Sequence, residues 1–386
     1  MMTHPMIVGV LLVFLLGCET TNTHRYAEMD AGFQDRFFEG YQEVAIETEE
    51  QVFAISPSMV RFIEQRRRYA ESPKEQVQEL VKGIFGRANM NLVYNSTANN
   101  TASQTFAQGQ ANCLSMTIMT YALADYAGMQ VHFQQVEVPE FWERRDGVSL
   151  LNGHVNLRIY PGDDSRYMYF SRPGLEVDFD PSEYRDVFES EKISKQRVLA
   201  MFYNNKAADA LVKDDYVTAY AYLKRALMTD PELPEGWVNL GVLYRYNHLL
   251  GEAEAAYHQA LNLAPNHTAL ENLALLYQMT GRDEQAEVML ARIERQRQDN
   301  PYYHFLLGEI ALDESHPKEA IDHYRDALKL DRNKHVFYFG LARAFAELGN
   351  MDATRRYLKK ARQYADYQDE ERRYDNKLNL LSRVSL

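Results

Sequence analysis

The chain has 386 residues, which is enough for two or three domains. Its acidic residues outnumber its basic ones by 55 to 42, giving a formal net charge of −13. Because binding to a phosphate backbone needs a basic surface, this balance argues against a nucleic-acid partner.

Residues 1–17 have the pattern of a signal peptide. The apolar run 6–16 is too short to span a bilayer and fits a signal h-region. It ends in Leu15-Leu16-Gly17-Cys18, which resembles the lipobox of bacterial lipoproteins and implies a lipid on Cys18 after cleavage. Glu19 follows, so the resemblance implies an outer-membrane protein that faces the periplasm. The segment before the apolar run lacks Lys and Arg, unlike the family pattern, and an uncut N-terminal anchor is the alternative.

Residues 18–50 are polar and acidic and predict a tether with little structure. We expect the first folded domain to cover residues 51–197. Helical spacing of apolar residues begins near Pro57 and recurs from Val77. The polar run 95–104 then predicts a loop that leads to Cys113.

Cys113 opens an apolar stretch that ends at Gly128 and predicts a buried helix of about four turns. A cysteine in the first turn faces unpaired backbone N–H groups and the positive end of the helix dipole, and both favour the reactive thiolate. With Cys18 lipidated, Cys113 has no partner in the chain, and a free thiol in an oxidising compartment suggests a function. The alternative is an ordinary small buried residue.

Strand-like alternation follows this helix. Residues 131–138 predict one strand, residues 152–160 a second that carries His154, and residues 167–171 a third. A fourth, over residues 175–180, places Asp178 and Asp180 on one face. A thiol, a histidine and a carboxylate on successive elements are what thiol attack on an amide requires: a nucleophile, a base and a group that orients the base.

These residues resemble the transglutaminase-like superfamily, whose fold is papain-like. The similarity covers residues 101–181 and is carried by 110–115 (QANCLS), 125–128 (DYAG), 152–155 (NGHV) and 176–181 (EVDFDP). It implies an α+β domain with Cys113 as nucleophile, His154 as base and an aspartate as the third member. Asp180 precedes Pro-Ser, as in many family members, so we favour it over Asp178.

The resemblance also implies a peptide or protein amide as substrate. Whether the acyl group passes to water or to an amine stays open, since solvent access and amine binding decide it. The backbone N–H of Cys113 is well placed to stabilise an oxyanion, and a second donor could come from Gln108, Gln110 or Asn112.

From residue 198 to 368 the pattern changes to helix pairs about 34 residues apart. The unit with Trp237, Gly241, Tyr244, Ala253 and Tyr257 resembles the tetratricopeptide signature, and about five such units recur. The resemblance implies an all-α solenoid, with residues 369–386 as a capping helix. Such arrays bind peptides or proteins in the groove lined by the first helix of each repeat. We expect its apolar contacts to include Val238, Leu275, Phe305 and Phe339.

The sequence contains no glycine-rich phosphate loop, no His-Glu-x-x-His motif and no cysteine pair for a metal cage, so we expect no cofactor and no metal. Our leading hypothesis is a lipid-anchored periplasmic acyl-transfer enzyme (a peptidase, an amidase or a transglutaminase-like enzyme) whose repeats recruit a substrate or a protein partner. The alternative is a catalytically silent scaffold that uses the repeats for protein–protein interaction.

Overall fold

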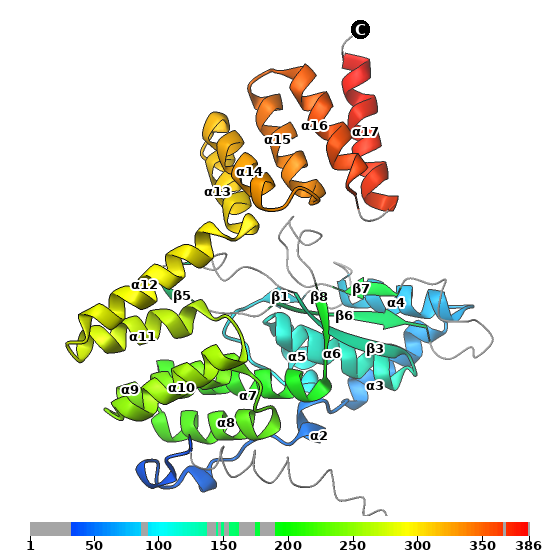
Figure 1. Ribbon diagram of the computed structural model, residues 1–386. Coiled ribbons are helices and arrows are strands. Elements are labelled where there is room, and N and C mark those ends of the chain that lie inside the picture. Colours follow the sequence, from blue (N-terminus) through cyan, green and yellow to red (C-terminus); the bar gives the residue numbers. More distant parts are fainter. Residues whose placement is uncertain are drawn as a thin grey trace, which may run out of the picture.

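The fold was analysed in a computed structural model (Figure 1). The structure describes the following residues: 32–85, 92–136, 144–145, 148–149, 154–161, 174–177, 190–365 and 368–384. Within these ranges a mixed α/β region precedes a long array of paired helices.

The described chain starts with a segment that packs against the helical array. Residues 32–47, named here the strap, contain two short 3₁₀ helices, η1 (Asp35–Phe37) and η2 (Tyr41–Glu43). Phe38 is 1% exposed and belongs to the core. This corrects the expectation of a tether up to residue 50: the aromatic residues of the strap bury enough apolar surface to hold it in place.

The helices that precede the sheet in the described residues include α2 (Glu49–Val52), α3 (Pro57–Arg67), α4 (Pro73–Phe85), α5 (Ala102–Gln108) and α6 (Cys113–Tyr126). Helix α6 is buried along most of its length, as its apolar sequence predicts. Its C-cap is Ala127, and Gly128 follows with a φ of +76°, a conformation that glycine adopts most readily. The predicted helix between Cys113 and Gly128 is therefore confirmed.

A four-stranded antiparallel sheet lies against α6. Its strands are β3 (Gln130–Val136), β6 (His154–Tyr160), β7 (Leu175–Val177) and β8 (Ser190–Ile193), in the order β7-β6-β3-β8. Tyr121 of α6 stacks on Phe133 of β3, with ring centroids 4.7 Å apart. Two short pairs complete the described strands: β1 (Val93–Tyr94) with β2 (Gln110–Ala111), and β4 (Arg144–Arg145) with β5 (Val148–Ser149). The strand predicted at residues 167–171 lies outside the described residues.

Helices α7 to α16 form consecutive antiparallel pairs, and α17 follows them (Figure 1). Their bounds are α7 (Lys195–Val212), α8 (Tyr216–Thr229), α9 (Pro234–Tyr246), α10 (Leu250–Leu263), α11 (His267–Met279), α12 (Asp283–Gln298), α13 (Pro301–Asp313), α14 (Pro317–Leu330), α15 (His335–Glu347), α16 (Met351–Gln363) and α17 (Gln368–Val384). The predicted all-α solenoid of tetratricopeptide-like pairs is confirmed.

Small residues in the first helix of a pair leave room for a tyrosine in the second. Tyr257 and Tyr324 are fully buried. A Cβ added to Gly241 would lie 2.5 Å from the Cε1 atom of Tyr257, and one added to Gly308 the same distance from Cε1 of Tyr324. The glycines are therefore required for close approach of the paired helices.

The solenoid core is interrupted between α12 and α13. One hydrophobic cluster runs from the strap to Ala286 of α12, and a separate cluster begins with Phe305 of α13. Leu290 occupies the position of Tyr257 and Tyr324, four residues after a buried alanine, yet it is 46% exposed. In Figure 1, α13 to α17 form an upper lobe that is set off from the lower repeats.

Candidate functional sites

Cys113 is the first residue of α6. Its side chain is partly buried and carries a free thiol. Asn112 caps the helix: its Oδ1 accepts a hydrogen bond from the Ser115 N–H at 2.8 Å. The thiol thus lies at the helix N-terminus, as the sequence indicates.

The helix of Cys113 is bonded directly to the strand of His154. One turn after Cys113, the Thr117 hydroxyl donates to the carbonyl oxygen of Val155 at 3.1 Å. Val155 is the second residue of β6, and His154, the first, pairs with Val136 of β3. The structure therefore brings together the elements that carry the predicted nucleophile and base.

Other predicted catalytic positions lie outside the description. For His154 the backbone is described but the side chain is not. Residues Cys18, Asp178 and Asp180 lie wholly outside the described residues. Strand β7 ends at Val177, and its Leu157–Val177 pairing with β6 gives the register up to that point.

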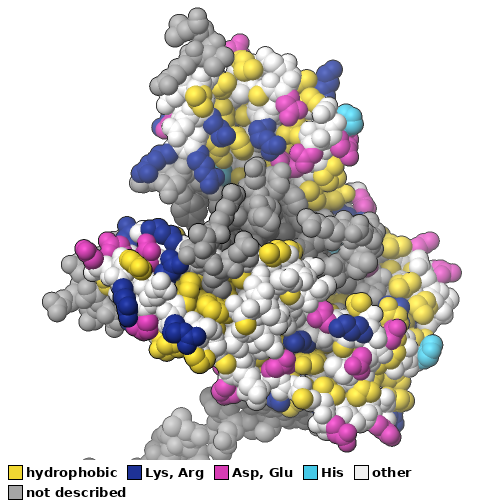
Figure 2. Space-filling model, turned by 180° about the vertical axis from the view of Figure 1, so that it is seen from behind, with side chains coloured by type: hydrophobic (Ala, Val, Ile, Leu, Met, Phe, Trp, Pro, Cys, Tyr) yellow, Lys and Arg dark blue, Asp and Glu magenta, His cyan; other side chains and the backbone are white. Residues whose placement is uncertain are grey.

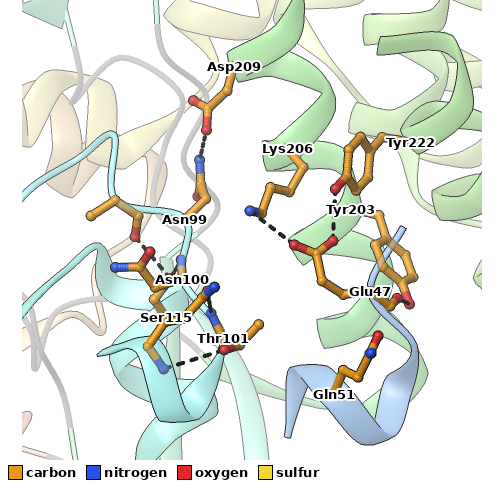
Figure 3. Close-up of polar contacts among 12 residues, drawn as sticks. Glu47, Gln51, Asn99, Asn100, Thr101, Ser115, Tyr203, Lys206, Asp209 and Tyr222 are labelled. Atoms are coloured by element: carbon orange, nitrogen blue, oxygen red, sulfur yellow. Dashed lines mark hydrogen bonds and ion pairs between the residues drawn. The ribbon is translucent and has the colours of Figure 1, made fainter. Parts of the chain in front are cut away.

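A polar network that the sequence did not reveal surrounds the start of α6 (Figure 3). Asn112 donates through Nδ2 to Asn99 Oδ1, and Asn99 Nδ2 donates to Asp209 Oδ2 of α7 at 2.6 Å. The Ser115 hydroxyl accepts from the Asn100 N–H at 2.9 Å and donates to the Ala98 carbonyl at 3.1 Å. The network connects α6 to α7, the first helix of the repeat array. In the sequence, the asparagine-rich run 95–104 was the available signal for it.

The hydrogen bonds of this network distinguish the three side-chain amides that could be the second hydrogen-bond donor to the oxyanion. Both polar atoms of Asn112 are engaged, which argues against a further role. Gln108 and Gln110 are exposed, and each accepts a hydrogen bond through Oε1, from Asn100 Nδ2 at 3.1 Å and from Asn95 Nδ2 at 3.3 Å. Their Nε2 groups are hydrogen-bond donors, so the candidates for the second oxyanion donor are reduced to these two glutamines.

A second candidate site is an open cleft of about 740 Å³ where α11, α12 and the start of α13 meet. It is lined by Pro265, His267, Arg292, Arg295, Gln296, Asp299, Asn300 and Pro301. The cleft lies where the solenoid core is interrupted. Exposed apolar side chains occur in the same repeats: Leu275 and Met279 of α11, Leu290 of α12 and Ile310 of α13.

A smaller cavity of about 280 Å³ lies between α2, the end of α6 and the start of α7. Lys195 lines it, pairs with Glu49 at 2.9 Å and lies 4.4 Å from the ring centroid of Phe53. The cation is already held by these groups, so the cavity offers little to an anionic ligand.

The predicted groove residues fall into different environments. Val238 and Phe305 are buried, at 2% and 3% exposure, which corrects their assignment as groove contacts. Phe305 lies 5.5 Å from the ring centroid of Phe337, because first helices of adjacent repeats pack against each other. Phe339 packs against Tyr374 of α17, with centroids 5.5 Å apart. Only Leu275, among these four, is substantially exposed, at 41%.

The surface charge of the array is uneven. Figure 2 shows several Lys and Arg side chains on the upper lobe, although the whole chain is acidic. Helix α16 contributes Arg355, Arg356, Lys359, Lys360 and Arg362. Among the described residues, none of the helices combines the length and apolar character needed to cross a membrane.

The chain matches the tetratricopeptide repeat family over residues 247–310, and again over residues 301–334. A curated relative is the protein O-mannosyl-transferase TMTC3 of Mus musculus, 28% identical over 183 residues. The match covers 43% of this chain and 20% of that protein, so the chain spans about a fifth of the relative's length. The human protein of the same name is 27% identical, with the same shares covered.

Similar solved structures include the crystal structure of the MamA protein, at 20% identity and a TM-score of 0.24, covering 43% of this chain and 91% of that one. YrrB, described as a TPR protein with an unusual peptide-binding site, is 17% identical, with 46% and 92% covered and a TM-score of 0.24. PilF of Pseudomonas aeruginosa is 20% identical, with 48% and 94% covered and a TM-score of 0.26. The family matches over residues 247–310 and 301–334 show that the protein carries tetratricopeptide repeats, which indicate protein–protein interaction.

Proposed function

We propose that the protein is an interaction protein whose repeats bind a protein or peptide at the junction of α12 and α13. The observation that carries this proposal is the interrupted core: Leu290 is 46% exposed where the equivalent tyrosines are fully buried. Apolar surface left open at a break in the core is a common property of binding sites. The catalytically silent scaffold is thus our leading function.

The composition of this surface indicates the kind of segment that fits. Leu275 and Met279 are four residues apart on α11 and so lie on one helix face. Arg292 and Arg295 of α12 line the cleft and add positive charge. We expect a partner segment with apolar anchors and flanking carboxylates, because charge complementarity steers and orients such contacts.

Site-specific photo-crosslinking in cells that produce the protein tests the proposal. A photoreactive phenylalanine analogue at position 275 or 290 should give one discrete adduct with a partner. The same analogue at Val212, which is 83% exposed on α7, is the matched control. Adducts of equal yield from all three positions, or none from 275 and 290, would contradict binding at this junction.

A second function is supported by the Thr117–Val155 hydrogen bond, which joins the helix of Cys113 to the strand of His154. We propose thiol acyl transfer on a peptide or protein amide, with Cys113 attacking and His154 moving the proton. Asp180 stands directly before Pro181 and Ser182, as in many members of the transglutaminase-like superfamily, and we therefore favour it over Asp178 as the orienting carboxylate.

Alkylation kinetics test this second function. Iodoacetamide should modify Cys113 at pH 7 at least about tenfold faster in the folded protein than in the urea-unfolded chain, because the thiolate is the reactive form. His154→Ala should remove the difference. If the folded thiol reacts no faster than the unfolded one, the acyl-transfer role is untenable and the scaffold role stands alone.

We also propose that the protein is anchored by a lipid on Cys18 to the bacterial outer membrane, facing the periplasm. Leu15-Leu16-Gly17-Cys18 supports this location. Cys18→Ser should give an uncut precursor or released protein. A mutant that keeps the wild-type mass and still fractionates with membranes would exclude the lipid anchor.

A further inference from the structure

Two histidines and an aspartate meet on the fourth helix pair. His304 of α13 and His323 and Asp326 of α14 each place one ligand atom within 4.8 Å of the others, and all three side chains are partly buried. His323 and Asp326 are three residues apart on one helix face, which lies against the start of α13. We propose that these three residues form a binding site for a divalent transition-metal ion of the Zn²⁺ type.

The hydrogen bonding of His304 prepares it as a ligand. Its Nε2 lies 2.9 Å from the carbonyl oxygen of Gln298, which can only accept a hydrogen bond. Nε2 therefore carries the proton, and the lone pair lies on Nδ1. A metal-bound histidine characteristically donates its other ring N–H to a carbonyl or carboxylate, which fixes the ring.

The same hydrogen bond recurs at the equivalent position of other repeats. Trp237 donates through Nε1 to the carbonyl of Pro231, and Tyr338 donates through its hydroxyl to the carbonyl of Arg332. Each acceptor lies six residues earlier, as Gln298 does for His304. His304 keeps the structural bond of this position, but unlike Trp it retains a second nitrogen with a lone pair.

The competing contacts of the cluster are weak enough for a cation to displace. Asp326 pairs with Lys329 at 2.6 Å, but the Lys329 side chain is 75% exposed and can turn to solvent. Glu319 Oε1 lies 3.8 Å from His323 Nε2 and can supply a fourth ligand or orient the ring. Two imidazoles with one carboxylate and an open position are a recurrent zinc donor set.

Bound metal would connect α13 to α14 in the lobe above the interrupted core. Because the ion binds the folded arrangement of ligands on two helices, it stabilises that lobe by mass action. Binding should weaken in acid, where protons compete for the imidazole nitrogens. This site is not visible in the sequence, because His323 follows His304 by 19 positions and the pairing of α13 with α14 brings the two together.

The test is zinc titration of the full-length, untagged protein in a Cys113→Ser background, since a thiol is itself a zinc ligand. We expect one zinc per chain to be bound and the melting temperature to rise with zinc. His323→Ala and Asp326→Asn should each weaken binding by more than about tenfold. His316→Ala is the control, because His316 is an exposed histidine at the start of the same helix, 3.7 Å from Glu314.

Three results would overturn the proposal: no stoichiometric zinc, unchanged affinity in His323→Ala and Asp326→Asn, or an equal loss in His316→Ala. Circular dichroism melting without zinc should show that the variants fold like the parent. If His323→Ala melts early, His323→Gln, which keeps the size but lacks the imidazole ligand, replaces it. The outcome is independent of the proposed functions of the repeats and the thiol.

Discussion

Phe38 stacks on Tyr220 of α8, with ring centroids 4.2 Å apart and ring planes 11° apart. The same tyrosine donates its hydroxyl to Asp35 Oδ1 at 2.6 Å, and Lys224 pairs with the same carboxylate. The strap is thus fastened to the first repeat by an apolar and a charged contact side by side. It becomes part of the solenoid core although the mixed α/β region separates the two in sequence.

The first prediction concerns the apolar contact. Phe38→Ala should lower the free energy of unfolding by about 3 kcal/mol, because it removes a fully buried ring and leaves a cavity. Phe37, the adjacent residue, is 47% exposed, and Phe37→Ala should cost less than about 0.5 kcal/mol. Urea denaturation measures both. Equal losses would mean that the strap is held by its backbone rather than by the Phe38 ring.

The second prediction concerns acid sensitivity. Burial raises the pKa of Asp35, but hydrogen bonds from Lys224, Tyr220 and Tyr41 outweigh it and leave the pKa below its ordinary 3.8. Burial also raises the pKa of Glu47, while a backbone hydrogen bond, Tyr222 and Lys206 bring it below its ordinary 4.5. Figure 3 shows Glu47 with Lys206, Tyr203 and Tyr222.

Since the folded pKa values lie below the unfolded ones, the two carboxylates stabilise the folded state fully above about pH 4.5. Their contribution is lost as the pH falls through the folded pKa values. Asp35→Asn should therefore flatten the loss of stability below that pH, by at most about 1 kcal/mol because Asp35 is 46% exposed. Denaturation midpoints between pH 7 and pH 3 measure it. An unchanged pH profile in Asp35→Asn would contradict this role.

The third prediction tests close packing in the repeats. Gly241→Ala should cost about 1–3 kcal/mol, since the new methyl group would lie 2.5 Å from a ring carbon of the buried Tyr257. Gly251→Ala in α10 is the matched control, as nothing lies within 4 Å of its added Cβ. That substitution should stabilise by about 0.5–1 kcal/mol through helix propensity. Thermal melting of the two variants should move in opposite directions, and a shared direction would refute the packing argument.

The fourth prediction concerns the cap of the thiol helix. Asn112→Ala removes the bond to the Ser115 N–H and also leaves Asn99 without its Asn112 donor. Asn350→Ala removes only a cap bond, to the Ala353 N–H at 3.1 Å. We expect about 1 kcal/mol for Asn350→Ala and about 2 kcal/mol or more for Asn112→Ala. Equal costs, measured by urea denaturation, would show that the bond from Asn112 to Asn99 contributes nothing to stability.

The local sequence pattern was enough to predict those helices and strands that depend on residues close together in the chain. The apolar run after Cys113 ends at a glycine with positive φ, so both the helix and its end were predictable. The 34-residue recurrence of small and aromatic residues predicted the helix pairs, because each pair must bury the same face. The alternation around His154 predicted β6 for the same reason.

Tertiary structure decided what depends on distant partners. The strap was expected to be a polar tether because acidic residues alternate with its aromatic ones, and α8 supplies the stacking ring and the lysine that hold it. Phe305 was expected in the groove, yet the neighbouring first helix buries it. The exposure of Leu290, the Asn99–Asp209 bond at the thiol helix and the meeting of His304 with His323 each require two elements to be placed in space. Periodicity states which face of a helix is apolar, but not which surface covers it.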